Sequence, residues 1–116
     1  MAYTNIYIGD KEDLRMYMND DIIGFTFTVK NSDSTAYDFT GWTDINLKIY
    51  THRGGTLKAT LVKTTNLTIS SNVVTLNADY SAEIYITETG NYYYELTYED
   101  ASSRPITIAY GDLMII

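Results

Sequence analysis

The chain has 116 residues, of which 45% are hydrophobic and 14% aromatic, and this length and composition suit one globular domain over residues 1–116. Its 15 acidic and eight basic residues give a net charge of -7, which would repel phosphate backbones and anionic lipids, so neither nucleic acid nor a membrane is an expected partner. The absence of cysteine excludes disulfides, thiolate metal sites and thiol catalysis.

The sequence gives no sign of a targeting or membrane-spanning segment. Its first residues, Met1-Ala2-Tyr3-Thr4-Asn5, have neither the basic region nor the apolar run of a signal peptide. No apolar stretch approaches the roughly 20 residues that a helix needs to cross a bilayer. We therefore expect a protein that is made in a cytoplasm and that is soluble or docks on other proteins.

Apolar and polar residues alternate with a period of two along most of the chain, and this pattern predicts strands. In the first half we expect strands over residues 4–8, 14–18, 23–29 and 44–50. In the third of these strands, one face would carry Ile23, Phe25, Phe27 and Val29, with threonines on the other face. Burial of one face only is typical of antiparallel sheets that pack face to face.

In the second half, the alternation predicts strands over residues 57–62, 73–77, 91–98 and 105–110, followed by a final apolar segment over 113–116. Turn-forming residues cluster between the strands, at 31–34, 52–55, 70–72 and 99–103. The alternation is lost over residues 80–86, where one helical turn could carry the chain from one sheet to the other. About eight strands at this spacing predict a sandwich or a small barrel.

Alternation also assigns side chains to the core. On the tyrosine-rich strand it places Tyr92, Tyr94 and Leu96 on the inner face and Tyr93 on the outer face. We expect a core that contains Phe25, Phe27, Ile45, Leu47, Ile49, Leu76, Tyr94, Leu96 and Ile108.

A tyrosine corner is the most informative local feature. In Thr89-Gly90-Asn91-Tyr92-Tyr93-Tyr94-Glu95-Leu96, a glycine leads into a strand that opens with tyrosine. In Greek-key sandwiches such a tyrosine lies at the entry to the penultimate strand, where its hydroxyl bonds to backbone a few residues upstream. Tyr92 is the candidate for this role. The corner favours an all-β fold of the immunoglobulin-like type, an antiparallel β-sandwich of about seven to nine strands.

Three short motifs in order carry a family resemblance. Asp38-Phe39-Thr40-Gly41 precedes an alternating strand and a glycine hairpin, and Gly90-Asn91-Tyr92-Tyr93-Tyr94-Glu95-Leu96 and Gly111-Asp112-Leu113 follow. This arrangement resembles the immunoglobulin-like N-terminal domain of phage baseplate upper proteins and related phage tail and head-fibre modules. The resemblance implies a structural protein of a virion, with other virion proteins as its partners.

No motif indicates an enzyme or a cofactor. His52, the only histidine, lies beside Arg53-Gly54-Gly55 in a predicted hairpin, where a solvated turn residue is expected rather than a general base. No Gly-x-Ser-x-Gly turn supports a nucleophile. The acidic residues at 10–13 and 20–21 have two interpretations. They could offer oxygen ligands to calcium, without EF-hand spacing, or they could guard an exposed sheet edge.

The many tyrosines and the final apolar segment are the candidates for an interface. The alternatives are that tyrosine merely suits strands and that the final segment completes a sheet edge. A flat amphipathic ring gives contact area at low entropic cost. In the final segment, alternation turns Leu113 and Ile115 one way and Met114 and Ile116 the other, so the core can cover only one pair. The candidate interface residues are Tyr3, Tyr7, Tyr17, Tyr93, Leu113, Met114, Ile115 and Ile116.

We therefore expect a virion protein of a phage, a structural or adaptor module that docks on capsid, neck, tail or baseplate components and on copies of itself. The alternative is a carbohydrate-binding module in which exposed tyrosines or Trp42 stack on sugar rings at a host surface. Trp42 in a flat, open face would favour the alternative, whereas Trp42 in the core would remove its best candidate.

Overall fold

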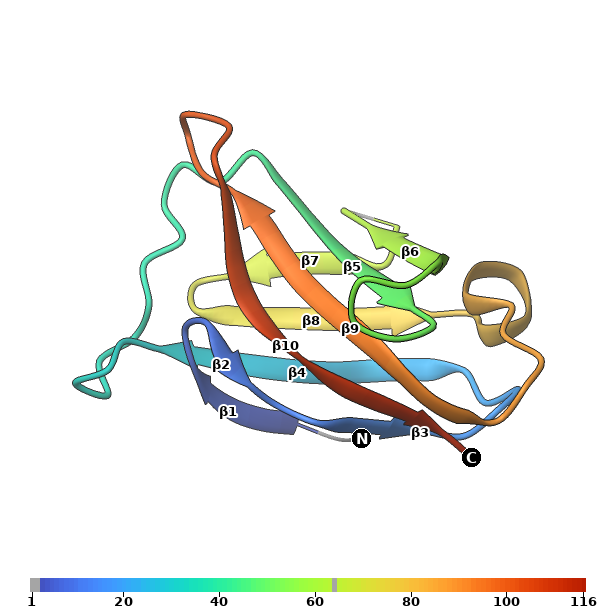
Figure 1. Cartoon of the computed structure of the whole chain (residues 1–116). Helices are drawn as coiled ribbons and strands as arrows, with labels where there is room; N and C mark the ends of the chain where they lie inside the picture. Colours follow the sequence, from blue (N-terminus) through green and yellow to red (C-terminus); the bar gives the residue numbers. More distant parts are fainter. Residues whose placement is uncertain (1–2, 64) are drawn as a thin grey trace.

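The computed structural model describes residues 3–63 and 65–116, which form two β-sheets that face each other (Figure 1). The strands are β1 (Tyr3–Tyr7), β2 (Asp10–Lys11), β3 (Leu14–Met16), β4 (Ile22–Lys30), β5 (Asp44–Tyr50), β6 (Leu57–Val62), β7 (Leu67–Ser70), β8 (Val73–Ala78), β9 (Gly90–Glu99) and β10 (Pro105–Ile115). A π-helical turn, η1 (Tyr80–Ile84), lies between β8 in one sheet and β9 in the other. In the part of the chain that the structure describes, no helix has the length and apolar character of a membrane span.

The two packed sheets form an all-β sandwich, which confirms the predicted fold class, although the described residues form ten strands where about seven to nine were predicted. One sheet has the order β1-β4-β8-β7 and the other the order β2-β10-β9-β5-β6, with β3 also pairing with β10. β4, β8 and β7 take the places of immunoglobulin strands B, E and D, and β10, β9 and β5 those of G, F and C. The strands pair antiparallel except at the start of the chain, where β1 is parallel to β4, and β2 and β3 are parallel to β10.

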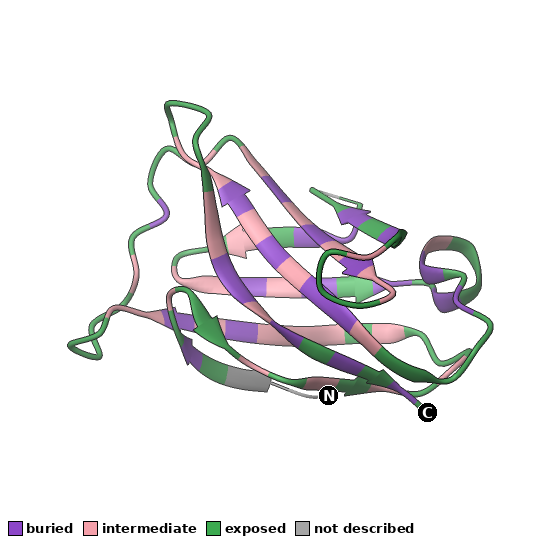
Figure 2. Cartoon of the chain, in the orientation of Figure 1, coloured by how far each residue is buried: buried purple, intermediate pink, exposed green. Residues whose placement is uncertain are grey.

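The inner faces of the two sheets form one core (Figure 2). Along β5, and along β9 from Tyr94 onward, every second residue is buried, as the period of two predicts. Phe25 is half-buried and packs against the core. The other predicted core residues are buried: Phe27, Ile45, Leu47, Ile49, Leu76, Tyr94, Leu96 and Ile108.

A β-bulge changes the pattern at the start of β4. The register with β8 shifts between Ile22 and Phe25, and Gly24 adopts a left-handed conformation with a φ of 65°. The backbone N–H of Gly24 donates to Oδ1 of Asn77 at 2.7 Å instead of joining the regular ladder. The extra residue reverses the alternation, so Ile23 points outward and is 74% exposed. The prediction that Ile23 faces the core is therefore wrong.

Some element boundaries also differ from those predicted. β2 and β7 lie outside the predicted strands, and the two residues of β2 are both charged and show no alternation. The predicted strand over 105–110 and most of the final segment, up to Ile115, belong to one strand, β10, which has a bulge between Thr107 and Ala109. The predicted helical turn is confirmed as η1, where the Asp79 side chain accepts a hydrogen bond from the N–H of Ala82 at 3.2 Å.

The tyrosine corner is confirmed. The Tyr92 hydroxyl donates to the backbone carbonyl of Glu88 at 2.8 Å and so ties the start of β9 to the connection that precedes it. Tyr94, two residues later, is fully buried, and its hydroxyl donates to the backbone carbonyl of Glu12. Burial raises the pKa of the Tyr94 hydroxyl above its ordinary range, which keeps this group a donor.

Replacing Phe27 with alanine should lower the free energy of unfolding by roughly 3 to 5 kcal/mol, because this side chain is fully buried. Urea denaturation followed by circular dichroism measures the loss. Thr28→Ala is the matched control on the opposite face of β4 and should cost less than about 1 kcal/mol. A loss below about 1 kcal/mol for Phe27→Ala would contradict the register of β4.

Tyr92→Phe should lower the free energy of unfolding by about 1 kcal/mol, because only the corner hydroxyl and its hydrogen bond to Glu88 are removed. Thermal denaturation should show a lower melting temperature with cooperativity retained. Tyr17→Phe, which removes the hydroxyl of an exposed tyrosine, is the control and should have the same melting temperature as the wild type. If Tyr92→Phe also has the wild-type melting temperature, the hydrogen bond of the corner contributes nothing to stability.

Candidate functional site

Exposed apolar side chains gather at one end of the sandwich. Tyr17 follows β3 and is 56% exposed, and Ile23 lies at the bulge of β4. Met114 and Ile116, at the end of β10, are 41% and 44% exposed. The end of β10 pairs with β3, and Figure 1 shows the C-terminus and the start of β4 at the same end of the sandwich. We call these four residues, Tyr17, Ile23, Met114 and Ile116, the end patch.

The final segment divides its side chains as the alternation predicts. Leu113 and Ile115 are each 1% exposed and point into the core, whereas Met114 and Ile116 point outward. Backbone hydrogen bonds hold the last residue in place: the Ile116 N–H donates to Met16 O at 3.0 Å, and the Met18 N–H donates to Ile116 O at 2.9 Å. The outward pair is therefore presented on a fixed strand.

A hollow of about 400 Å3 opens beside the end patch. It lies between the edges of the two sheets, because β1 pairs only with Thr26–Lys30 and β3 lies along β10 in the other sheet. A narrower slot of about 40 Å3 opens between the same two edges. The hollow, which we call the end hollow, is lined by Arg15, Met16, Tyr17, Asp20, Asp21, Ile22, Ile23 and Phe25. The slot is lined by Leu14, Arg15, Met16, Ile22, Phe25 and Leu76.

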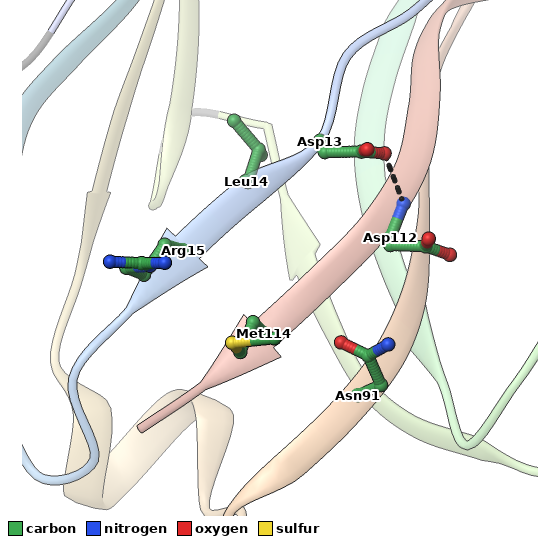
Figure 3. Close-up of a pocket in the computed structure, with 6 residues that line it drawn as sticks. All are labelled: Asp13, Leu14, Arg15, Asn91, Asp112 and Met114. Carbon is green, nitrogen blue, oxygen red and sulfur yellow. Dashed lines mark hydrogen bonds between the residues drawn. The ribbon is translucent and has the colours of Figure 1, made fainter.

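A second hollow, of about 300 Å3, lies on the outer face of the β3–β10 edge (Figure 3). Its residues come from β3, β9, β10 and the segment before β3. Asp13 Oδ1 accepts a hydrogen bond from the backbone N–H of Asp112 at 3.0 Å and another from Nζ of Lys11 at 3.0 Å. These two bonds, the backbone one first, lower the pKa of the Asp13 carboxyl below its usual value. The rim of the end patch is therefore charged on this side.

Two of the acidic residues near the chain start, Asp13 and Asp21, are engaged by protein groups. Asp13 binds Lys11 and the backbone of β10, and Asp21 Oδ1 accepts the N–H of Tyr80 at 2.9 Å. In residues 3–63 and 65–116, no three histidine or acidic side chains come together as metal ligands. β2, which pairs with β10 alone, presents Asp10 and Lys11 at a sheet edge. This placement matches the edge-guard interpretation.

The remaining tyrosine candidates separate into exposed and covered ones. Tyr7 is exposed, with its hydroxyl 3.2 Å from Oγ of Ser34. Tyr93 faces outward, as alternation predicts, but is only 7% exposed. The rings of Tyr50 and Tyr110 lie beside it, and the guanidinium of Arg53 lies 5.8 Å above it. The expectation that Tyr93 is open to a partner is wrong. The side chain of Tyr3 lies outside the described part of the structure.

Trp42 does not form an open platform. Its ring is half-buried against the core, and Nζ of Lys63 lies 5.5 Å from the ring centroid. His52 is exposed in the hairpin between β5 and β6, with Nδ1 3.2 Å from the carbonyl oxygen of Arg53. Trp42 therefore contacts Lys63 and the core, and His52 contacts the backbone of its own hairpin.

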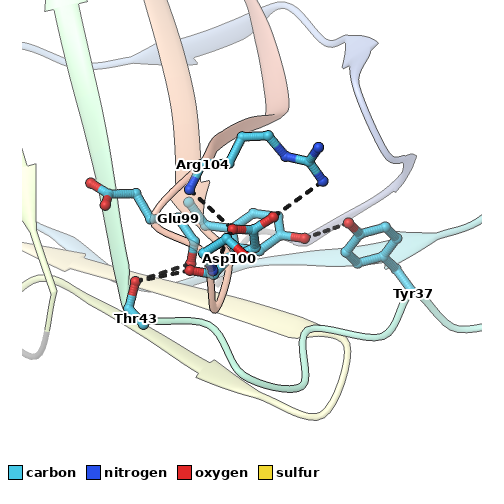
Figure 4. A network of polar contacts seen from close by, with 7 residues as sticks. Tyr37, Thr43, Glu99, Asp100 and Arg104 are labelled. Carbon is cyan, nitrogen blue, oxygen red and sulfur yellow. Dashed lines mark hydrogen bonds and ion pairs between the residues drawn. The ribbon is translucent and has the colours of Figure 1, made fainter.

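Polar contacts close the opposite end of the sandwich (Figure 4). The hydroxyls of Tyr37 and Tyr98 share a hydrogen bond, and burial raises the pKa of Tyr98 above its ordinary range. In the β9–β10 turn, Asp100 binds the side chain of Arg104 at 3.3 Å and its backbone N–H at 3.0 Å. The Thr43 hydroxyl donates to the Asp100 carbonyl at 3.2 Å. The two ends of the domain therefore differ, since this one is tied by polar groups and the other exposes apolar ones.

No protein-family model matches the chain, and no curated protein was found to be similar to it. The site is therefore interpreted from its geometry. Sequence reasoning identified Tyr17, Met114 and Ile116 but missed Ile23. The signal that could have identified it is Gly24, because a glycine inside a strand often marks a bulge.

Proposed function

We propose that the chain is a structural or adaptor module of a phage virion, which docks on capsid, neck, tail or baseplate proteins through protein–protein contacts. The observation that carries this proposal is the end patch, four exposed apolar side chains at one end of the sandwich, of which Tyr17 and Ile23 line the end hollow. Exposed apolar side chains that gather in one region are typical of sites that bind other proteins. The motifs that resemble phage baseplate domains support the choice of partner.

Hydrogen bonds within the domain hold the backbone of the end patch in place without a partner, and this order favours binding. Met114 and Ile116 lie on a strand end that is bonded to Met16 and Met18, and Ile23 is held by the bulge that Asn77 caps. A fixed surface loses less conformational entropy on binding than a mobile one. The mechanism that we propose is therefore geometric recognition, with no catalytic step and no cofactor.

A carbohydrate-binding role is the second candidate, and one observation favours it. Tyr85 is 76% exposed and borders a hollow of about 140 Å3 that is also lined by Lys58, Thr87 and Glu88. A free ring beside charged and hydroxyl groups suits stacking on a sugar. Trp42 does not serve this role, because its ring is half-buried and lies under Lys63.

Ile23→Lys and Met114→Lys should abolish docking without unfolding the domain, because both side chains are exposed and changes at such positions cost at most about 0.5 kcal/mol. The measurement is the amount of the chain in purified particles of the phage that encodes it, by quantitative mass spectrometry. Each variant should be reduced at least about tenfold, which corresponds to a loss of about 1.4 kcal/mol of binding free energy.

Val62→Lys is the matched control, since Val62 is also apolar and is 45% exposed, but lies on β6 outside the end patch. It should be incorporated like the wild type. Absence of the wild-type chain from the particles would overturn the proposal. Binding to a glycan array that Tyr85→Ala abolishes, with Ile23→Lys unaffected, would favour the carbohydrate alternative instead.

A further inference from the structure

The backbone of β3 has an open edge beside the end patch. β3 pairs with β10, and none of the described strands pairs with it on its other side. The Met16 carbonyl accepts from Ile116, and the Met18 N–H donates to Ile116, so these backbone groups point toward β10. Successive residues of a strand point their backbone groups to opposite sides. The N–H and C=O of Arg15 therefore point away from β10, toward the open edge.

The slot beside this edge is narrow and mostly apolar, so it suits one small apolar side chain of an added strand. Its walls come from β3 of one sheet and from β4 and β8 of the other, through half-buried Met16 and Phe25 and buried Leu76. It widens into the end hollow, where Ile23 is exposed. Every second side chain of a strand laid along β3 would point between the two sheets. An occupant with apolar residues at alternate positions would fill the slot and the hollow.

The charged residues around the end hollow indicate which charges the ends of an added strand should carry. Arg15 is the only basic residue lining the end hollow, and Asp20 and Asp21 line the same hollow. Asp13 and Asp112 line the adjoining hollow on the outer face. The excess of carboxylates favours basic groups at the ends of an added strand. A second copy of this chain, with its net charge of -7, would bring more carboxylates to the same place and be repelled.

We propose that an extended segment of a different protein, with alternating apolar residues and flanking lysines or arginines, adds to the open edge of β3 as a further strand. Main-chain hydrogen bonds to Arg15 supply affinity, and the apolar side chains that enter the slot supply specificity. This inference rests on the proposed function, because it describes how the docking partner is held.

Synthetic peptides test the inference directly. The probe has a core of about six residues of alternating valine and threonine, with two lysines at each end. Isothermal titration calorimetry should show that it binds the wild-type protein. A peptide with the same core and glutamates at both ends should bind at least about tenfold more weakly. A lysine-flanked peptide that is N-methylated at alternate core residues should also lose at least about tenfold, because it lacks the donors of a strand.

Arg15→Pro and Arg15→Ala form the matched pair of protein variants. Proline removes the N–H at the open edge, and edge strands accept proline where the N–H faces solvent, so the domain should still fold. Arg15→Pro should weaken binding of the lysine-flanked peptide at least about tenfold, whereas Arg15→Ala, which keeps the N–H, should not. The N-methylated peptide gives the same test on the unaltered protein if Arg15→Pro fails to fold.

Equal binding of the parent and the N-methylated peptide, tighter binding of the glutamate-flanked peptide, or no peptide binding at all would overturn strand addition. These outcomes are separate from the test of the proposed function. If Arg15→Pro enters particles like the wild type while Ile23→Lys and Met114→Lys do not, the end patch docks without strand addition, and the proposed function stands.

Discussion

The first part of the chain, residues 3–16, pairs with both sheets, and the shape of the domain depends on this double pairing. Residues 3–7 lie along β4 in one sheet, and residues 10–16 lie along β10 in the other. The change of sheet falls between Ile8, whose N–H donates to Lys30 O at 2.8 Å, and Gly9, whose N–H donates to Ile108 O at 2.8 Å. Three residues later, the Glu12 carbonyl accepts the Tyr94 hydroxyl. A β-carbon on Gly111 would lie 2.6 Å from that carbonyl oxygen, so the close approach of the segment to β10 needs a glycine at this point.

The open end of the sandwich follows from this crossing. Among the described residues, β1 accompanies β4 along Thr26–Lys30, and β3 covers one side of β10 while no described strand pairs with its outer side. The hollow between these edges is bordered by apolar side chains, whereas the opposite end is closed by the contacts of Tyr37, Tyr98 and Asp100. The two ends of the domain therefore differ: polar contacts close one end, and the other end has a hollow bordered by apolar side chains.

Local alternation predicts most of the fold, because burial of one sheet face imposes a period of two. The strands over 44–50 and 57–62 have the predicted bounds, and the division of the final segment into an inner and an outer pair is as predicted. Features that depend on distant contacts could not be predicted in this way. The parallel pairings at the chain start, the capping of the Gly24 bulge by Asn77 and the covering of Tyr93 by Arg53 each join residues far apart in sequence or across a loop. Three of the four end-patch residues, Tyr17, Met114 and Ile116, were predicted from the sequence, whereas the exposure of Ile23 depends on the bulge.

Hydrogen exchange of individual backbone amides in the isolated protein tests the central claim most directly. The amides of Glu12 and Met18 donate to carbonyls of the β10 segment and should exchange slowly. The amide of Arg15, which lies between them on the open side of β3, should exchange nearly as fast as an exposed loop amide. Protection of Arg15 equal to that of Glu12 and Met18 would contradict the account, because the edge would then already be covered in the isolated protein.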